Sequence, residues 1–414
     1  MVRSAYCEAV AYFEQALSAL AHLPEQRDTL EQAIDLRLAL RSALTPLGDA
    51  RRALACLREA EAVASALDDP QRLGRVSRFL TVDLYRIGAH DQAIAAAQRA
   101  LALASASGDV VLHALTNGSL GEAYRAHGDY RQAIACFEQT MAFLDESRRY
   151  ERFGELVFPA VQSRAWLAWC HAELGMFAEG STLAEEGLRI AEAVAHPASL
   201  MRGYWGLGQL ALLQGNLPRA LPMLERAVGI CQDADIPAMF PWMAAALGAA
   251  YTLAGRVADA VPLLTQAMAQ ATAMGRVDVQ DICRLSLGET QVQAGHLEEA
   301  YTLAERALAH AHEYQGHGNQ AYVLRLLGEI AVHGEPGQAE QAEAYYRQAL
   351  ALAEELGMRP LQAHCHLGLG TLYAATGQRE PARTALSTAI ALYQAMEMTF
   401  WLPQAEAALV QVEG

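Results

Sequence analysis

The chain has 414 residues and a formal net charge of −16, and all 31 of its basic residues are arginine because the sequence contains no lysine. Such an acidic balance argues against a nucleic-acid groove and against a surface for anionic membranes. Hydrophobic residues make up 53% of the chain but aromatic residues only 7%, which indicates an alanine-rich interior suited to close helix packing. The seven cysteines are scattered and form no C-x-x-C pair, so we expect reduced thiols and a cytoplasmic protein.

The first 22 residues predict an amphipathic helix. Ala9, Phe13 and Ala16 have the spacing that recurs in the second helix of each later helix pair, yet no first helix precedes them. We therefore interpret residues 1–22 as the second helix of a truncated repeat, and we expect the natural protein to be longer. The apolar face of this helix should be exposed or covered by a second copy of the chain, which would favour self-association.

From residue 30 onward the chain repeats one pattern, which is clearest in LGEAYRAHGDYRQAIACF at Leu120–Phe137. Gly121 lies on one predicted helix, Gly128 interrupts it, and Ala133 opens the next helix. The alanine that opens each second helix recurs mostly at intervals of 40 residues, and glycine takes its place once. These positions are Ala53, Ala93, Ala133, Gly180, Ala220, Ala260, Ala300, Ala342 and Ala382.

This pattern of a helix glycine, a turn glycine and a helix alanine resembles the tetratricopeptide repeat (TPR). HEAT-type repeats share the period but lack these glycine and alanine positions. The resemblance implies an all-α fold, a TPR solenoid in which antiparallel helix pairs form one right-handed superhelix of about nineteen or twenty helices. We expect a single continuous domain over residues 1–414. Its helix pairs should occupy 30–68, 73–108, 112–146, 160–196, 199–235, 239–275, 279–315, 319–357 and 361–398, followed by a closing helix at 399–414.

Two stretches depart from the regular pattern. One interval between second helices is 47 residues long because of an insertion at 147–159, SRRYERFGELVFP. Insertions in solenoids form loops on one face and are often contact sites, although slack connectors are equally common. The uncharged window at 236–255 resembles a membrane span, but two prolines and a glycine interrupt it and it keeps the repeat spacing. We interpret this window as a buried helix of the solenoid.

Catalytic motifs are missing from the sequence. There is no phosphate-binding loop, which would need lysine, no nucleophile elbow, no H-E-x-x-H helix and no paired-cysteine metal site. His364 and His366 would point about 200° apart on a helix, so they cannot grip one ion. The glutamates that follow repeat glycines belong to separate repeats and do not form an acid–base pair. The sequence therefore predicts a chain that is not an enzyme and that binds no cofactor or metal.

The inner wall of the predicted superhelix is the better place to look for binding. In TPR proteins the residues six, three and one places before the first-helix glycine, and one place after it, tend to face the concave surface. By this rule Trp169, Trp205 and Trp242 should lie near one another across adjacent helices. Aromatic residues beside arginine are typical of binding hot spots, but the same tryptophans could instead fill the core between repeats. The candidate surface comprises Arg78, Tyr85, Glu122, Arg125, Trp169, Arg202, Trp205, Gln209, Trp242, Glu289, Arg325 and Glu329.

Longer phrases resemble one bacterial family. Among them are SRAWLAWCHAELGMFAEG, from Ser163, and MEMTFWLPQAEAAL, from Met396. They are similar to the C-terminal TPR region of class III adenylate or guanylate cyclases in which a cyclase domain and an AAA-type ATPase precede the repeats. The similarity spans essentially the whole chain, but no cyclase or ATPase motif is present. A more distant resemblance is to the superhelical sensor domain of ATP-dependent LuxR-type transcription activators, which bind a small inducer.

Both resemblances imply a regulatory role. We expect a non-catalytic protein-interaction module, the C-terminal sensor or scaffold of a larger signalling protein, with a protein, a peptide or another domain of the parent protein as its partner. The alternative is a small-molecule sensor of the LuxR type. We expect neither a nucleic-acid nor a membrane partner. A closed apolar pocket with converging polar groups would favour a small ligand, whereas a long open channel would favour a peptide.

Overall fold

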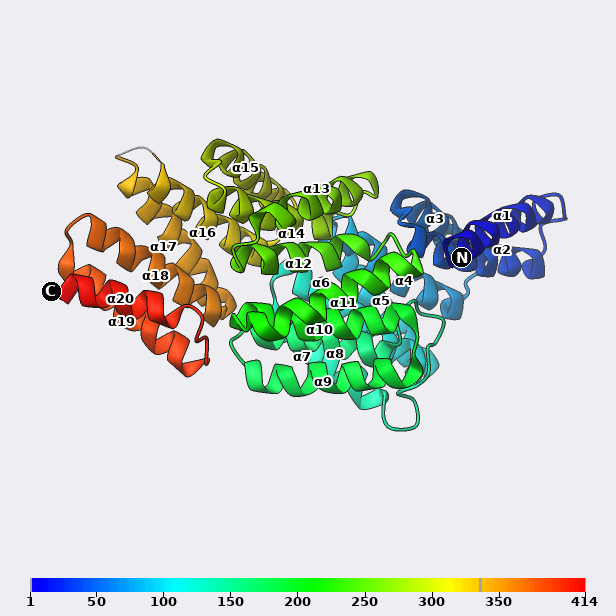
Figure 1. Ribbon diagram of the computed structural model, residues 1–414. Coiled ribbons are helices and arrows are strands. Elements are labelled where there is room, and N and C mark those ends of the chain that lie inside the picture. The colour runs from blue at the N-terminus through cyan, green and yellow to red at the C-terminus, as the bar shows by residue number, and fades with distance from the viewer. Residues whose placement is uncertain (1, 335–336, 414) are drawn as a thin grey trace.

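The computed structural model describes residues 2–334 and 337–413, and these form twenty α-helices and no strand (Figure 1). The predicted all-helical fold is therefore confirmed. Nine helix pairs lie between α1 (Val2–Leu20) and α20 (Leu402–Glu413). The first helices of the pairs are α2 (Arg27–Leu47), α4 (Pro70–Arg86), α6 (Val110–His127), α8 (Pro159–Glu173), α10 (Pro197–Gln214), α12 (Phe240–Leu253), α14 (Val277–Gln293), α16 (His317–His333) and α18 (Arg359–Ala375). The second helices are α3 (Ala50–Ala66), α5 (His90–Ser107), α7 (Tyr130–Phe143), α9 (Phe177–Val194), α11 (Leu217–Ala234), α13 (Val257–Ala273), α15 (Leu297–Glu313), α17 (Ala339–Leu356) and α19 (Arg379–Ala395).

Small residues fill the seam between the two helices of each pair. The alanines that open the second helices are all 2% exposed or less. On the first helices a glycine faces a large side chain of the partner helix, and a Cβ added at Gly208 would lie 2.7 Å from Leu224. Gly180 stands where the other repeats have alanine because a Cβ there would lie 2.6 Å from Leu210. The glycines and alanines therefore recur at these positions because the two helix backbones approach too closely for larger side chains.

Successive turns of the superhelix contact each other, because α4 contacts α14, α6 contacts α16 and α8 contacts α18. Each of these first helices thus meets the first helix that lies five repeats further along the chain. Some of the turn glycines also lie where the two superhelical turns touch. Gly48 and Gly128 have positive φ, and a Cβ added to them would lie 2.6 Å from Met274 and 2.9 Å from the backbone nitrogen of Gly318, respectively. Gly295 has the same backbone conformation, but the space beside it is open.

The N-terminal helix has a partner within the chain. Val10, Phe13 and Leu17 of α1 pack with Leu44 of α2 and Ala53 of α3 in one apolar cluster. The expectation that this face lacks a partner within the chain is therefore wrong, and Phe13 and Leu17 are partly rather than fully buried by that partner. The sequence interpretation treated α1 as an unpaired second helix, whereas α2 folds back along it and covers its apolar side. Figure 1 shows α1, α2 and α3 together at one end of the molecule.

The two irregular stretches have distinct structures. The uncharged window at 236–255 contains α12, whose side chains are largely buried in the largest hydrophobic cluster. Among the described residues, no helix combines the length and the apolar character that crossing a membrane requires. The insertion at 147–159 forms most of the connection between α7 and α8. Its later residues turn back towards the first helices, where they border the smaller of the two cavities described below.

Candidate functional site

A cavity of about 510 Å³ lies between the first helices of the two superhelical turns. We call it the central cavity. Its walls come mainly from the first helices α6, α8, α10, α12, α14, α16 and α18. His90 of α5, Tyr130 of α7, and Phe400, Trp401 and Gln404 before and at the start of α20 also contribute to them. Because first helices face the superhelix axis throughout the array, one continuous chain brings seven repeats to a common space.

One repeat position supplies successive side chains to this wall. The residue directly after the first-helix glycine position is Trp169 in α8, Gln209 in α10, Ala249 in α12, Glu289 in α14 and Glu329 in α16, and all five line the central cavity. Neighbouring members of this series are 40 residues apart, so they occupy the same face of successive helices. The concave-face rule for this position therefore holds in five consecutive repeats.

Three charged residues from α14 and α16 meet in the central cavity. Arg325 donates from Nη1 to Oε2 of Glu329 at 2.9 Å and also pairs with Glu289 of the preceding repeat. Two carboxylates share one guanidinium, which leaves a surplus of negative charge. Burial raises the pKa of Glu289, an effect that Arg325 only partly offsets. This part of the wall is suited to a cationic or hydrogen-bond-donating ligand group.

Glu173 ties the two superhelical turns together at the cavity wall. Its carboxylate accepts hydrogen bonds from Nε1 of Trp169 and from the hydroxyl of Tyr322, each at 2.7 Å. Trp169 lies on the same helix, α8, whereas Tyr322 lies on α16, the first helix four repeats further along the chain. Burial raises the pKa of Glu173 to about 7, although both hydrogen bonds and the nearby Arg125 oppose the shift. The carboxyl group therefore changes its protonation state near neutral pH.

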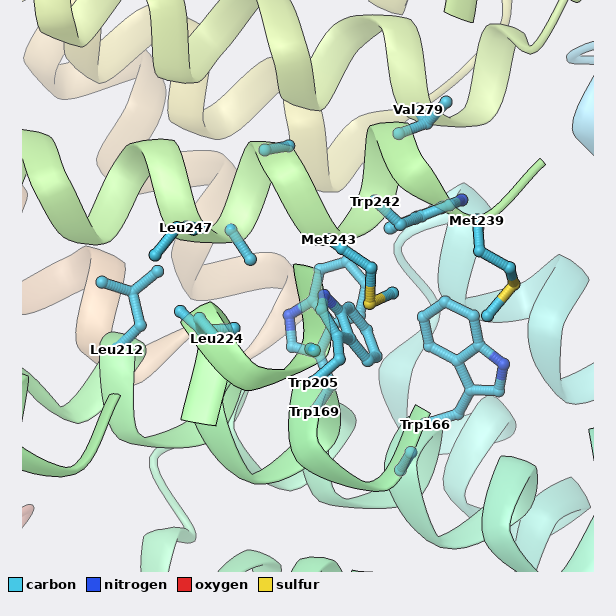
Figure 2. Packing of buried hydrophobic residues seen from close by; sticks show 14 of the residues in the cluster. Trp166, Trp169, Trp205, Leu212, Leu224, Met239, Trp242, Met243, Leu247 and Val279 are labelled. Carbon is cyan, nitrogen blue, oxygen red and sulfur yellow. The ribbon is translucent and has the colours of Figure 1, made fainter. Parts of the chain in front are cut away.

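Four tryptophans form a compact cluster beside the central cavity, and Figure 2 shows them between the first helices. We call Trp166, Trp169, Trp205 and Trp242 the Trp cluster. All six ring pairs have centroids 5.1 to 6.0 Å apart, which confirms the predicted proximity. Every member is at most 7% exposed, and only Trp169 lines the cavity. Trp205 and Trp242 are core residues, not an open surface, because rings from three adjacent helices cover one another.

Two arginines lie against the Trp cluster. The guanidinium carbon of Arg125 is 4.5 Å from the centroid of Trp166 and 4.6 Å from that of Trp169. Arg202 lies 4.6 Å from Trp166 and 4.7 Å from Trp205. Neither arginine forms an ion pair with any residue that the structure describes. Aromatic faces attract the guanidinium groups but supply no counter-charge, so both cations remain available to an anion.

The twelve residues proposed from sequence separate into three groups. A second cavity, of about 90 Å³, lies between α4, α6, α8 and α10, and we call it the side cavity. Trp205, Trp242 and Tyr85 line neither cavity, and the hydroxyl of Tyr85 donates to Glu122. Those in the central cavity are Arg125, Trp169, Gln209, Glu289, Arg325 and Glu329. Those in the side cavity are Arg78, Glu122 and Arg202.

Sequence reasoning missed several cavity residues. Tyr322 lies six places before the glycine of α16, so the concave-face rule, applied there, would have selected it. Glu173 lies beyond the positions that the rule covers. Asp278 and Asp281 face the cavity from α14, where Asp278 is held by both Nε and Nη2 of Arg276 at 2.8 and 2.7 Å. No spacing in the sequence distinguishes these carboxylates from solvated ones.

Comparison with known families agrees with this architecture. Residues 80–146 and 331–395 match one tetratricopeptide repeat family, and residues 244–277 match a second family of the same description. No curated protein matches the sequence. Together with the twenty helices and their regular pairing, the matches define the chain as an all-helical TPR array.

Several solved structures share this fold. A Rap protein complexed with competence and sporulation factor has a TM-score of 0.58 at 16% identity, covering 86% of this chain and 97% of its own. The Rap conjugation gene regulator of plasmid pLS20, in complex with the Phr* peptide, has a TM-score of 0.55 at 14% identity, covering 88% and 97%. Aspartyl phosphate phosphatase F from Bacillus subtilis has a TM-score of 0.50 at 15% identity, covering 85% and 90%. At such identities the likeness establishes the fold alone.

Proposed function

We propose that this chain is a regulatory binding module that holds a short peptide, or an extended segment of a protein partner, in the central cavity. The observation that carries the proposal is the convergence of first-helix side chains from seven repeats on one space of about 510 Å³. This volume lies within the range of about 300–1,000 Å³ that is usual for ligand sites. A TPR array offers an extended concave surface of this kind for binding.

The charge distribution of the cavity suits a peptide. Glu289 and Glu329 share a single arginine and therefore favour a cationic group, such as an amino terminus. Arg125 carries a charge without an ion-pair partner among the described residues and favours a carboxylate. Leu212 and Leu253 supply apolar surface between these groups. A short peptide carries both charges and apolar side chains on one chain, so it matches all three features.

The structural neighbours support the same class of ligand. One Rap structure contains competence and sporulation factor, and another contains the Phr* peptide. Both neighbours cover most of this chain, so a comparable inner wall is available here. The neighbour called a phosphatase raises a different possibility, and hydrolysis of an acyl phosphate by this chain would contradict a purely binding role.

A small-molecule sensor is the second candidate function. The volume of the cavity and its converging polar groups would also accept a metabolite, as the resemblance to LuxR-type sensor domains implies. In either case we propose a cytoplasmic regulatory part of a larger signalling protein. The resemblance to the repeat region of cyclase–ATPase proteins and the scattered free cysteines support that setting.

A cavity-filling variant tests the proposal. Ala249→Trp places an indole in the central cavity, whereas Ala258→Trp places one on an exposed site of the adjacent α13. Immobilised parent chain should retain a subset of a pool of short random peptides, Ala258→Trp should retain the same subset, and Ala249→Trp should retain none. Mass spectrometry of the eluates measures this. Equal retention by both variants would overturn the proposed site, and stabilisation by a metabolite without any peptide retention would favour the second candidate.

A further inference from the structure

Arg202 is a buried cation without an anionic partner. Its side chain is 4% exposed, and it forms no ion pair with any residue in the described part of the chain. Its Nε and Nη1 atoms have no hydrogen-bond partner there, and Nη2 contacts only the sulfur of Met239 at 3.8 Å. The adjacent rings of Trp166 and Trp205 attract the charge but leave these N–H groups unsatisfied. A buried charge in this state is strongly unfavourable unless something else compensates it.

The side cavity beside Arg202 is lined by two further arginines. Arg78 and Arg86 line it as well, and in each of them Nε lacks a hydrogen-bond partner. The carboxylates on the wall are those of Glu122 and Glu155. Arg78 pairs with Glu155 and Arg86 pairs with Asp83, so of these three guanidinium groups Arg202 is the one without an ion pair among the described residues. The cavity therefore favours an anion over a neutral molecule or a cation.

Both carboxylates of the wall are already engaged by other groups. Glu155 accepts a hydrogen bond from Nη2 of Arg78 at 2.7 Å. Glu122 accepts one from the hydroxyl of Tyr85 and another from Nε2 of Gln162, the latter at 2.9 Å. Rearranging either carboxylate to face Arg202 would break these hydrogen bonds and expose another charge. The unsatisfied guanidinium therefore needs a partner from outside the chain.

The insertion between α7 and α8 gives this cavity a wall of its own. Glu155, Leu156 and Val157, near the end of the insertion, line the side cavity opposite the first helices. Its volume of about 90 Å³ is several times the 10–15 Å³ that one water needs, so a small ion of a few heavy atoms fits. Waters alone could accept the hydrogen bonds but would leave the charge uncompensated.

We propose that the side cavity is a binding site for a small tetrahedral oxyanion of the phosphate or sulfate class, with Arg202 as its principal ligand. Oxygens of such an ion would lie against the guanidinium of Arg202, which lines the cavity, and supply the counter-charge that it lacks. Arginines line the cavity from α4 as well as α10, and the four oxygens of a tetrahedral ion offer acceptors in several directions to both helices. This site is separate from the central cavity and does not depend on the proposed peptide ligand.

Titration with inorganic phosphate at constant ionic strength tests this site. The parent chain, dialysed free of phosphate and sulfate, should show a saturable rise in melting temperature and a change in tryptophan fluorescence, because Arg202 touches two indoles. Sulfate should act similarly and acetate weakly. Arg202→Met should melt higher than the parent without phosphate, since the buried charge is gone, and should bind phosphate about tenfold to a hundredfold more weakly.

Matched variants make the outcome decisive. Arg226→Met removes an exposed arginine from the neighbouring α11 and should leave the phosphate response unchanged. Ala249→Trp in the central cavity should also leave it unchanged, which separates this site from the proposed function. If Arg202→Met does not fold, Arg86→Met tests the same wall and should weaken phosphate binding. No saturable response in the parent, or an undiminished response in Arg202→Met or Arg86→Met, would overturn the inference.

Discussion

Trp205 and Arg325 occupy the same repeat position, three residues before the first-helix glycine, in α10 and α16. Trp205 is 1% exposed inside the Trp cluster, whereas Arg325 faces the central cavity between two carboxylates. The repeat geometry points both side chains towards the superhelix axis. Whether the space there is filled or open depends on the neighbouring repeats and on the superhelical turn opposite.

The difference divides the inner wall into a packed part and an open part. From α8 to α12 the inward residues Trp205, Trp242 and Ala245 are buried in the largest hydrophobic cluster, and of these helices' inward residues Trp169, Gln209 and Ala249 border the central cavity. From α14 to α16 the equivalent positions carry Glu289, Arg325 and Glu329, whose charges need water or a ligand. We infer that the packed part holds the superhelix closed and that the open part is free to bind. Substitutions at equivalent positions can test this division.

The largest expected difference is between Trp205→Ala and Arg325→Ala. Removing the indole leaves a cavity in a closely packed core, and we expect a loss of about 3–5 kcal/mol in the free energy of unfolding. Removing Arg325 leaves two carboxylates that face cavity water and can take up protons, so we expect a loss of only about 1–2 kcal/mol. Urea unfolding followed by circular dichroism measures both. Equal losses would mean that the inner wall is not divided as proposed.

The sequence was informative about the seam between the two helices of a repeat. Gly208 packs on Leu224 at a distance of sixteen residues, and the same spacing joins Gly248 to Leu264, so the recurring helix glycines lie at this seam. The candidate surface was recovered in part for the same reason, because the residue after the glycine position points inward in five consecutive repeats.

Contacts between superhelical turns could not be predicted in this way. The hydrogen bond from Tyr322 to Glu173 joins residues 149 positions apart, and Gly48 meets Met274 across an even longer separation. Such pairings depend on a small rotation per repeat that accumulates over four or five repeats, and no local sequence pattern specifies the total rotation. The burial of Trp205 and Trp242 was left open for the same reason, since only the closed superhelix shows which inward positions are covered.

A pair of turn glycines tests the contact between superhelical turns. Gly128 and Gly295 both have positive φ, so alanine at either site should cost about 1–2 kcal/mol in backbone strain. At Gly128 the added Cβ would also lie 2.9 Å from the backbone nitrogen of Gly318, which cannot move aside as a side chain can. We therefore expect a total loss of about 2–4 kcal/mol for Gly128→Ala, as overpacking adds to the strain.

Thermal unfolding of the two glycine variants at one pH gives the comparison directly. The space beside Gly295 is open, so Gly295→Ala serves as the matched control for backbone strain alone. Indistinguishable melting temperatures for the two variants would show that α6 and α16 do not press together at this turn in solution.

The smallest expected effect concerns Glu173, which lies at the border between the packed and open parts. Its pKa of about 7 in the folded chain exceeds the ordinary value of 4.5, because burial disfavours the carboxylate. The folded state therefore holds a proton that the unfolded chain releases. Stability from this group is fully present below about pH 4.5, declines as the pH rises, and is lost above about pH 7.

Glu173→Gln should abolish this pH dependence, since the amide keeps the shape of the protonated acid and can still accept from Trp169 or Tyr322. A shift from 4.5 to about 7 corresponds to about 3 kcal/mol at full ionisation, and cavity water should reduce that to roughly 1–2 kcal/mol. We thus expect the variant to be more stable than the parent at pH 8 and about equal to it near pH 4.5. Urea unfolding across this pH range measures the difference. The opposite result, a variant less stable than the parent at pH 8, would contradict this expectation. It would mean that the two hydrogen bonds to the ionised carboxylate stabilise the folded state by more than the burial of its charge destabilises it.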